Sequence, residues 1–260
     1  MITKKLSLCM LVQNEEEIID LPLKSVIGLV DEVVIVHDGI PKDNTEQVIK
    51  DTLNPTKIPY KFIVDTEYCR HFGKQRQIAI NNAEGEWLLW LDADECIDPI
   101  LQERIKEVIK EPEIDSCHLE YVHFVNDFVH IDNSVPVHIG LFRLYKNNGK
   151  VNLALIRNHA IPRSENFNKT IMVVGGYIWH LGYLKGIKHI FESYRRSFVQ
   201  SEIHSSYELC KWRDRHLLGN YPTTPIKIDD IPILIRLKYH IGIYDINYIN
   251  ESFNKVINQL

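Results

Sequence analysis

Three carboxylates stand directly after an apolar run at residues 87–91 and are well placed to do chemistry: Asp92, Asp94 and Glu95. Clustered carboxylates repel one another, and burying them without a cation is costly. A hard divalent ion is their natural partner, and Mg²⁺ or Mn²⁺ with few protein ligands usually also coordinates substrate phosphates. The pattern therefore indicates a metal site for a phosphorylated substrate. The alternative is a solvated acidic turn that caps a helix beginning near Pro99.

A further acid, Asp38, ends a second apolar run at residues 33–36 and is followed by a polar stretch. A carboxylate at the end of a buried strand can accept a hydrogen bond from a nucleobase N–H or a ribose hydroxyl. Asp43 and Thr45 in the polar stretch are of the types that cap helix N-termini. Asp38 is thus a candidate for binding a nucleoside, whereas we interpret Asp43 and Thr45 as caps.

Two cations, Lys74 and Arg76, lie near the start of a helix predicted over residues 73–83. Positive charges oppose the helix dipole at an N-terminus, so an anionic ligand would explain their placement. The alternative is that both are ordinary solvated surface cations.

The elements that would position these side chains follow from the spacing of apolar residues. Strands are predicted over residues 6–12, 32–36, 60–64 and 87–91, and helices over residues 15–29, 45–53 and 73–83. This alternation predicts an α/β fold with a mainly parallel sheet and helices on both faces. Ligands of such sheets bind beyond the carboxyl ends of the strands, where the acids named above are expected.

The pattern changes after residue 115. Strand-like segments at residues 118–128, 140–145 and 171–178 are joined by polar loops, and a long, mostly helical stretch covers residues 186–217. We therefore expect a mostly helical C-terminal extension to follow the α/β domain.

Composition limits the class of protein. The 260-residue chain has 45% hydrophobic and 25% charged residues, the balance of a globular protein rather than a disordered or fibrous one. With a net charge of −5, the chain is not basic as nucleic-acid-binding proteins usually are. It contains no run of about 18 apolar residues, so no transmembrane helix is predicted. Five cysteines without a CxxC pair favour reduced thiols, and the polar residues 13–17 argue against a signal peptide. We expect a cytoplasmic protein with no nucleic-acid partner and at most peripheral contact with the inner face of a membrane.

Histidines raise the question of a zinc site, because four of them follow one another closely: His118, His123, His130 and His138. Their spacings of five, seven and eight residues fit neither a helical i, i+4 pair nor a tight strand pair. We interpret them as ordinary core or surface side chains.

Four motifs follow one another between residues 7 and 95. They are Leu11-Val12-Gln13-Asn14-Glu15; Asp38 with Asp43 and Thr45; Phe72-Gly73-Lys74-Gln75-Arg76; and Ala83-Glu84-Gly85-Glu86-Trp87 leading into Asp92-Ala93-Asp94-Glu95. Together they resemble the nucleotide-binding half of family 2 glycosyltransferases with the GT-A fold. Segments 141–145, 157–159 and 178–183 resemble the bacterial surface-polysaccharide and lipopolysaccharide-core subgroup of that family.

The resemblance implies a domain organisation and a nucleotide site. A GT-A domain would span residues 1–185, with a nucleotide-binding half at 1–98 and an acceptor half at 99–185, and the extension would span 186–260. Glu15 and Asp38 would surround the nucleoside, and Arg76 would lie near the base or the diphosphate. Asp92 would approach the ribose or a metal-bound water.

The resemblance also implies a metal site and a general base. Asp94 would bind the metal directly, and His180 would be a further metal ligand. The histidine that precedes it in the subgroup's pattern, His159, is usually followed by a glutamate, but Ala160 stands here. The base is therefore open, with His159 and Asp127 as candidates.

These expectations describe a metal-dependent glycosyltransferase that uses Mn²⁺ or Mg²⁺. It would move a sugar from a nucleoside-diphosphate sugar, UDP preferred, to a hydroxyl of a glycan, lipid-linked or other acceptor, and the resemblance implies inversion. Two alternatives stay open. The first alternative is a nucleotidyltransferase. Such an enzyme normally has an early glycine-rich loop, and the absence of glycine from residues 11–18 argues against it. A catalytically inactive nucleotide-sugar-binding protein would explain Ala160.

Overall fold

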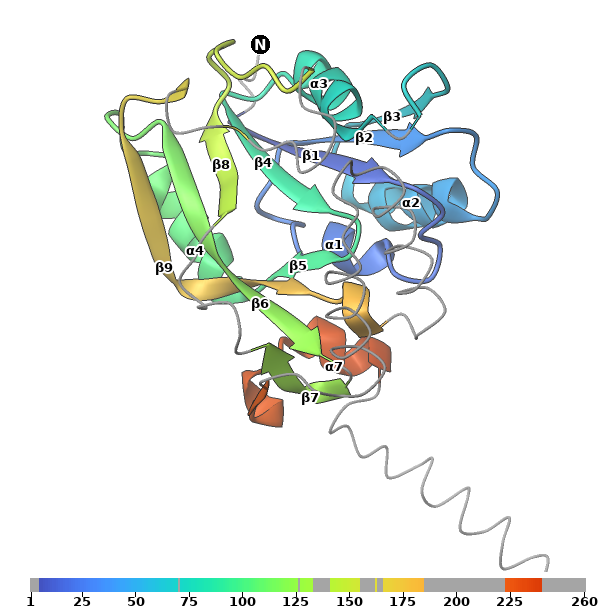
Figure 1. Ribbon diagram of the computed structural model, residues 1–260, viewed down its shortest axis with the longest axis vertical. Helices are drawn as coiled ribbons and strands as arrows, with labels where there is room; N and C mark the ends of the chain where they lie inside the picture. The colour runs from blue at the N-terminus through green and yellow to red at the C-terminus, as the bar shows by residue number, and fades with distance from the viewer. Residues whose placement is uncertain are drawn as a thin grey trace, which may run out of the picture.

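The computed structural model describes residues 5–69, 71–125, 127–132, 141–154, 162, 166–184 and 223–239. This part of the chain is built around one large curled sheet with helices packed against it (Figure 1). The strands are β1 (Leu6–Val12), β2 (Glu32–Asp38), β3 (Tyr60–Asp65), β4 (Trp87–Asp92), β5 (Glu95–Ile97), β6 (Ser116–Val125), β7 (Asp127–Asp132), β8 (Leu141–Lys146), β9 (Thr170–His180) and β10 (Thr223–Pro225). The helices are α1 (Asp20–Lys24), α2 (Thr45–Leu53), α3 (Phe72–Asn82), α4 (Pro99–Val108) and α7 (Ile233–Tyr239), with short 3₁₀ turns η1 (Asn54–Thr56), η3 (Gly182–Leu184) and η4 (Ile228–Asp230).

Both faces of the parallel part of the sheet are covered by helices. Strands β3, β2, β1 and β4 lie side by side in that order, and all are parallel. Successive side chains of a strand point to opposite faces. Leu8 and Met10 of β1 accordingly pack in one core with residues of α1, α2 and α4, whereas Cys9 packs in another with Ala79 and Ile80 of α3. This arrangement confirms the predicted fold class.

The strand order reverses between β1 and β4. The chain places β2 and β3 on one side of β1 and then crosses over to place β4 on the other side. In open α/β sheets, ligands bind beyond the carboxyl ends of the strands at such a point. Leu11 near the end of β1 lies opposite Asp92, the last residue of β4. The acidic turn thus begins where the topology favours a ligand site.

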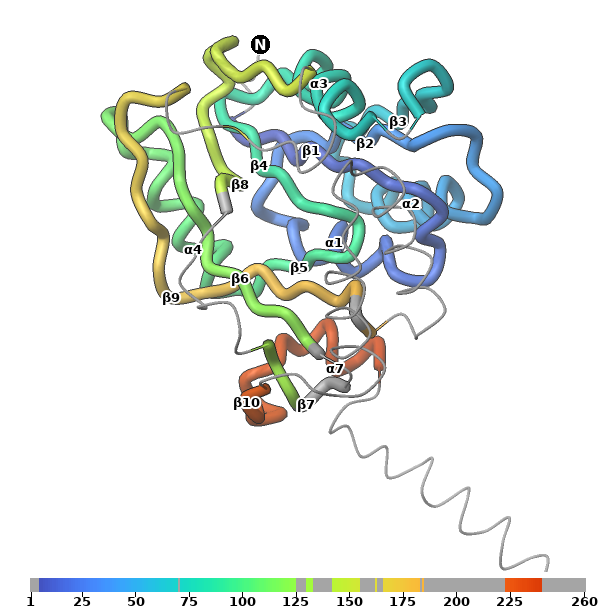
Figure 2. Tube along the Cα trace, viewed as in Figure 1, coloured from blue at the N-terminus to red at the C-terminus, as the bar shows by residue number. Residues whose placement is uncertain are grey.

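A bend in β9 brings the second half of the chain to this same region (Figure 2). Its first residues pair with the start of β6, and its last residues pair with both β6 and β5. Gly175 and Gly176 occupy the bend with φ of 82° and 145°. A Cβ on Gly176 would also collide with the backbone of Leu101 in α4, so only glycine fits. The bend places His180 opposite Glu95 of β5.

The predicted helix over residues 15–29 is wrong in its extent. Only Asp20–Lys24 is α-helical, and turns flank it. Pro22 has no N–H to donate, and the Ser25 hydroxyl bonds the Pro22 carbonyl oxygen at 2.8 Å. Ile19 and Leu23 are nevertheless fully buried, which explains why the apolar spacing resembles that of a longer helix.

Part of the predicted C-terminal extension returns to the domain. β10 pairs with β7, and Lys238 Nζ of α7 lies 2.8 Å from Asp20 Oδ1 of α1. Residues 186–222 and 240–260 lie outside the described residues, so the mostly helical character of the extension and the domain boundary stay predictions.

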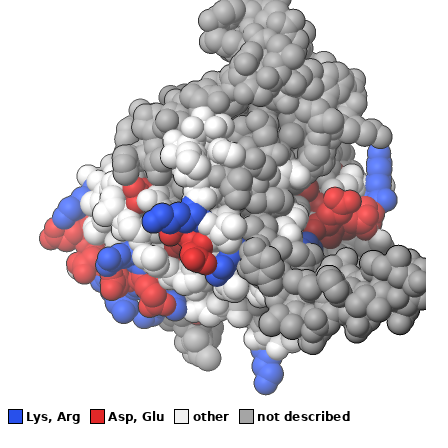
Figure 3. All heavy atoms as spheres, turned by 90° about the horizontal axis from the view of Figure 1, so that it is seen from below, with Lys and Arg blue, Asp and Glu red and all other residues white. Residues whose placement is uncertain are grey.

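The surface of the described chain carries mixed charge. Acidic and basic side chains lie beside one another on the face in Figure 3, and α4 contributes the pairs Lys106–Glu103 and Arg104–Glu107. Exposed pairs of this kind contribute little to stability. Among the residues that the structure describes, no helix is long and apolar enough to span a bilayer.

Candidate functional site

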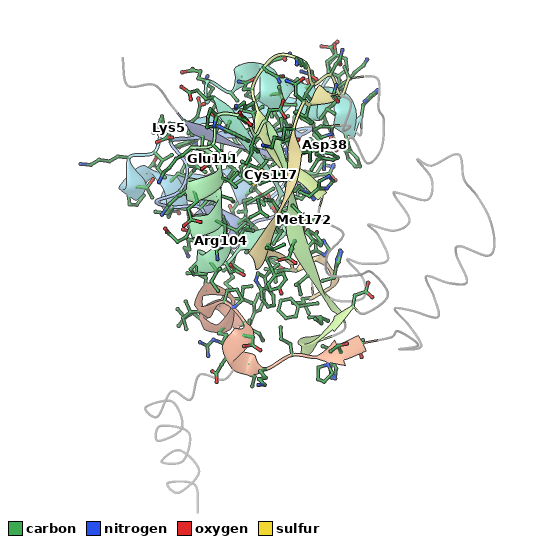
Figure 4. The ribbon with its side chains drawn as sticks, turned by 90° about the vertical axis from the view of Figure 1, so that its left-hand side faces the viewer. Lys5, Asp38, Arg104, Glu111, Cys117 and Met172 are labelled. Atoms are coloured by element: carbon green, nitrogen blue, oxygen red, sulfur yellow. The ribbon has the colours of Figure 1, made fainter. Side chains whose placement is uncertain are left out.

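Two buried aspartates are the last residues of neighbouring parallel strands, and both accept hydrogen bonds from the side-chain amide of one glutamine. Asp38 of β2 lies opposite Asp65 of β3, and each is only 6% exposed. Gln75 of α3 donates from Nε2 to Asp38 Oδ1 at 2.8 Å and to Asp65 Oδ2 at 3.0 Å. Gln13 Nε2 donates to the other oxygen, Asp38 Oδ2, at 3.0 Å. Figure 4 labels Asp38 on the opposite side of the view from Arg104, which lies in α4.

Asp65 and Gln75 were missed by the sequence analysis. Asp65 also ends an apolar strand, so the rule that identified Asp38 could have found it. Gln75 is fully buried and carries no charge, so only the structure reveals its role.

Asp92 is held by three donors. Its Oδ1 accepts from Arg76 Nη2 at 2.8 Å and from Trp90 Nε1 at 3.1 Å, and its Oδ2 accepts from Arg143 Nη2 at 3.1 Å. Burial alone would raise the pKa of Asp92, but the two guanidinium groups hold the pKa well below its usual value. Asp92 is therefore an anion over the whole physiological pH range, and a third of its side chain remains exposed.

Glu95 turns inward from the acidic turn. It is 1% exposed and accepts from Arg143 Nη2 at 2.5 Å, from Tyr121 Oη at 2.6 Å and from the backbone N–H of Asp92 at 2.8 Å. Burial is the largest influence on this carboxyl group and raises its pKa to about 7, although Arg143 opposes the rise. Arg143 thus joins Asp92 and Glu95 and fixes the backbone of the turn between them.

The two cations near the start of α3 differ from each other. Arg76 pairs with Asp92, lies over the Trp90 ring with its guanidinium carbon 4.7 Å from the centroid, and is only 11% exposed. It is therefore not a solvated surface cation. Lys74 Nζ lies 4.4 Å from the centroid of the Tyr68 ring.

Asp94 lies beside His180, the last residue of β9. His180 Nε2 lies 3.7 Å from Asp94 Oδ1, and the two side chains are 17% and 20% exposed. The Leu181 N–H donates to the Asp94 carbonyl oxygen at 2.8 Å, which ties the two segments together. A Cβ on Gly182 would lie 2.7 Å from Asp94 Oδ2 and 2.7 Å from His180 Nε2. The space beside the carboxylate and the imidazole therefore depends on a glycine.

These two side chains fit a divalent cation that takes its other ligands from a substrate. Within the described ranges, no group of three or more His, Cys, Asp or Glu side chains is arranged to hold a metal. Mg²⁺-type sites, however, commonly use one or two protein ligands together with phosphate oxygens and water. Asp94 would supply a charged oxygen to such a cation, and His180 would supply an imidazole nitrogen.

His123, which the sequence analysis interprets as an ordinary core or surface side chain, lies next to His180. It lies opposite His180 in the pairing of β6 with β9, and the two Nδ1 atoms are 3.1 Å apart. Burial, followed by the neighbouring His180, lowers the pKa of His123 to about 3. Its ring is therefore neutral at pH 7.

The acidic turn does not cap the following helix, so that alternative is wrong. Asp98 is the N-cap of α4 and accepts from the Leu101 N–H at 2.7 Å. The N-cap of α2 is Asn44, whose side chain makes no capping bond, so Asp43 is not the N-cap; it precedes Asn44 and accepts from the Thr45 N–H at 3.0 Å. Thr45 does not cap α2: its hydroxyl accepts from the Glu15 N–H at 2.7 Å and ties the end of β1 to α2.

The remaining predicted site residues are placed only in part. Glu15 lies in the turn after β1, beside the start of α2, through this Thr45 contact. Asp127 is the first residue of β7, but its side chain lies outside the described part of the chain, as does the whole of His159. The general base therefore stays a prediction.

Comparison with known proteins identifies a family and structural relatives. Residues 7–170 match the model of glycosyl transferase family 2. A 109-residue region is 31% identical to a TPR repeat-containing protein of Synechococcus elongatus, and it covers 42% of this chain and 25% of that protein. The chain thus spans about a quarter of the length of that curated relative.

Two solved structures share the fold. S. aureus TarS 1–349 in complex with UDP is 16% identical with a TM-score of 0.53, over 82% of this chain and 72% of that chain. The same TarS fragment in complex with UDP-GlcNAc is 17% identical with a TM-score of 0.51, over 82% and 73%. These likenesses confirm the predicted GT-A fold. Because the family model matches more than half of its length, the chain belongs to glycosyl transferase family 2.

Proposed function

We propose that this protein is a metal-dependent glycosyltransferase that moves a sugar from a UDP-sugar to a hydroxyl acceptor. The observation that carries the proposal is the placement of two acidic groups around the strand-order reversal. The buried pair Asp38 and Asp65 lies at the ends of β2 and β3, and Asp94 lies beside His180 beyond the end of β4. A nucleoside at the first group and a diphosphate at the second would span this edge of the sheet.

Asp38 would accept from the nucleoside, and its position is held by Gln13 and Gln75. Asp92 with Arg76 would lie between the two groups, where the ribose meets the diphosphate. UDP is the proposed nucleotide because the structural relatives are described in complex with UDP and UDP-GlcNAc.

Asp94 and His180 would hold Mn²⁺ or Mg²⁺. Such a cation offsets negative charge that develops on a departing diphosphate. The chain's own contribution is a rigid turn: Arg143 and Glu95 fix the backbone on both sides of Asp94, so the carboxylate needs little rearrangement when the donor binds. Preorganised charge of this kind is a large term in catalysis.

The acceptor hydroxyl would attack the anomeric carbon from the face opposite the leaving diphosphate and invert the configuration. A base must take the hydroxyl proton, and we keep His159 and Asp127 as candidates. The acceptor would be a glycan, a lipid-linked sugar or another hydroxyl compound. The cysteine pattern and the polar residues 13–17 favour a cytoplasmic enzyme with at most peripheral membrane contact.

The proposal is tested by incubating the protein with a panel of UDP-sugars and Mn²⁺ and measuring the release of UDP. Slow hydrolysis of one donor is the expected result, because water can replace the acceptor. Release of pyrophosphate from UTP and a sugar 1-phosphate would instead favour a nucleotidyltransferase. Donor binding without any turnover would favour a nucleotide-sugar-binding protein.

Replacing Asp38 by Ala is expected to weaken UDP affinity by about 1–3 kcal/mol, because a charged hydrogen bond to the nucleoside is lost. Isothermal titration calorimetry of the variant measures this change. Asp51→Ala is the control and should leave the affinity unchanged, because the Asp51 carboxylate bonds the Gln47 amide on the exposed face of α2. A folded Asp38→Ala protein with wild-type UDP affinity would remove Asp38 from the site.

Replacing Gly182 by Ala is expected to weaken Mn²⁺ binding to the UDP complex by roughly 10- to 100-fold. The added methyl group would push Asp94 and His180 away from their present positions. Titration of Mn²⁺ followed by electron paramagnetic resonance measures the free ion directly. Gly28→Asn is the control, because no atom lies within 4 Å of a Cβ at Gly28 and asparagine is among the residues that best tolerate its φ of 82°. Wild-type affinity in Gly182→Ala would contradict a cation site at this point.

A further inference from the structure

His37 is a buried side chain that contacts the turns after two neighbouring strands. It stands in β2 immediately before Asp38, and it is fully buried. Its Nδ1 lies 2.7 Å from the carbonyl oxygen of Gly39, and its Nε2 accepts from the Asn14 N–H at 3.3 Å. One imidazole ring therefore connects the turn that follows β1 with the turn that follows β2.

The two partners fix which ring nitrogen of His37 carries hydrogen. A backbone carbonyl can only accept a hydrogen bond, and a backbone N–H can only donate one. Nδ1 must therefore donate to Gly39, and Nε2 must present its lone pair to Asn14. A second hydrogen, on Nε2, would point at the Asn14 N–H and break this contact. The ring is thus held in the neutral form with its hydrogen on Nδ1.

The two residues that His37 holds come directly after the side chains proposed to bind the nucleoside. Asn14 follows Gln13, whose Nε2 donates to Asp38 Oδ2 at 3.0 Å. Gly39 follows Asp38 itself. Asn14 and Gly39 have φ of 54° and 77°, in the left-handed region, so the chain turns sharply at both. The ring thus fixes the backbone beside Gln13 and Asp38, where the chain leaves the two strands.

A further contact between the two turns lies nearer the surface. The Lys42 N–H donates to Asn14 Oδ1 at 2.8 Å, and this hydrogen bond is exposed. His37, in contrast, is enclosed beside the Phe62 ring of β3, with centroids 5.9 Å apart. Water can replace a contact that is lost at the surface, whereas a backbone group left without its partner in the interior pays the full cost of desolvation.

We infer that His37 is a positioning residue for nucleoside binding, which holds the turns after β1 and β2 so that Asp38 meets the nucleoside with Gln13 beside it. The inference rests on the proposed function and extends it to a residue that would act without touching the nucleotide. Loose turns would have to be ordered when the nucleotide binds, and that ordering would reduce the affinity. The two contacts of His37 order them in the free protein.

The first test is the tautomer of His37 in the nucleotide-free protein, measured by long-range ¹H–¹⁵N correlation spectra. The His37 signals are assigned by their loss in His37→Gln. We expect hydrogen on Nδ1 alone, and UDP should leave this pattern unchanged because both contacts are already formed. Hydrogen on Nε2 would overturn the inference.

The second test is UDP affinity, measured by isothermal titration calorimetry. His37→Phe keeps a ring but removes both hydrogen bonds, and it should weaken UDP binding roughly 10-fold. His37→Asn should recover part of the loss, because an amide NH₂ in place of Nδ1 can donate to Gly39. His37→Gln should also recover part of it, because an amide oxygen in place of Nε2 can accept from Asn14. Wild-type affinity in a folded His37→Phe protein, or equal loss in all three variants, would overturn the inference.

Ile35→Val is the matched control for lost stability. Ile35 stands two residues before His37 in β2, on the same face of the sheet, and is fully buried. The substitution should lower the melting temperature and leave the UDP affinity unchanged. If it weakens UDP binding as much as His37→Phe does, the effect comes from a general loss of stability and the inference is wrong.

Hydrogen exchange in the wild-type protein gives a result that does not depend on the folding of any variant. UDP should slow exchange of the Asn14 N–H more than that of the Asp115 N–H, which bonds the Lys169 carbonyl oxygen at 3.1 Å beside β6 and β9. The reason is that UDP and His37 stabilise the same arrangement of the two turns. Equal slowing at both amides would contradict the inference.

Steady-state kinetics distinguish donor positioning from a direct part in the reaction. His37→Phe should raise KM for the UDP-sugar and change kcat little, because Asp94 and His180 lie outside both turns. A lower kcat at unchanged KM would contradict a role in donor positioning.

Asp38→Ala separates this inference from the proposed function. If Asp38→Ala weakens UDP binding and His37→Phe does not, the nucleoside site stands and the inference about His37 is wrong. If neither variant weakens UDP binding, the proposed nucleoside site itself is wrong.

Discussion

The Asp94→Asn variant is expected to lose sugar transfer by roughly 10²–10³-fold in kcat. Asn keeps the size of the side chain and leaves the Leu181 hydrogen bond to the backbone carbonyl intact, so the turn should keep its fold. The negative charge beside His180 Nε2 is lost, and with it the charged oxygen that a hard cation prefers. The initial rate of UDP release at saturating donor and Mn²⁺ measures the effect.

Asp51→Asn is the matched control, since it removes a carboxylate from the exposed face of α2. It should keep the wild-type rate. The melting temperature of both variants shows whether either change alters the fold. Full activity of a folded Asp94→Asn enzyme in Mn²⁺ would mean that the acidic turn does not bind the metal.

The Arg143→Met variant is expected to be destabilised by about 3–5 kcal/mol. Without Arg143, Glu95 is buried either as a charge without a cation or as a carboxylic acid that must take up a proton on folding at pH 7, and both reduce stability. Arg143 is 4% exposed and contacts both Asp92 and Glu95. Asp92 keeps Arg76 when Arg143 is removed, but Glu95, 1% exposed, keeps no cation among its described contacts. Guanidinium chloride unfolding followed by circular dichroism measures the loss.

A second substitution separates lost charge from lost packing. Glu95→Gln in the Arg143→Met background removes the group that must be buried charged or take up a proton. The oxygen of the new amide can accept from the Asp92 N–H, and its NH₂ group can donate to the Tyr121 hydroxyl oxygen. The double variant should therefore be more stable than Arg143→Met alone. If the two are equally unstable, the contribution of Arg143 comes from its packing rather than from its charge.

Much of the candidate site could be predicted from short stretches of the sequence. Asp38, Asp92 and Asp94 each stand at the end of an apolar run, and such runs become buried parallel strands whose carboxyl ends meet at one edge. The family motifs then suggested their roles. The same local rule applies to Asp65, which was overlooked because no motif includes it.

The helix at residues 15–29 shows where local patterns mislead. Ile19 and Leu23 have the periodic spacing of a helix and are buried as expected. The spacing of apolar residues predicts which side of a segment faces the core, but it does not predict which backbone hydrogen bonds form. Pro22 and Ser25 determine those, and they divide the segment into turns around a short helix.

The sequence by itself thus accounts for the α/β class, for the apolar strands and for the acids at their ends, because these depend on residues that are near one another along the chain. The partners of those acids depend on tertiary structure. Arg143 reaches Asp92 from β8, and His180 reaches Asp94 only because β9 bends at Gly176. His123 faces His180 only in the register that β6 and β9 adopt. A shift of one residue would turn each of these side chains to the other face of the sheet, and the register is set by the packing of the whole core.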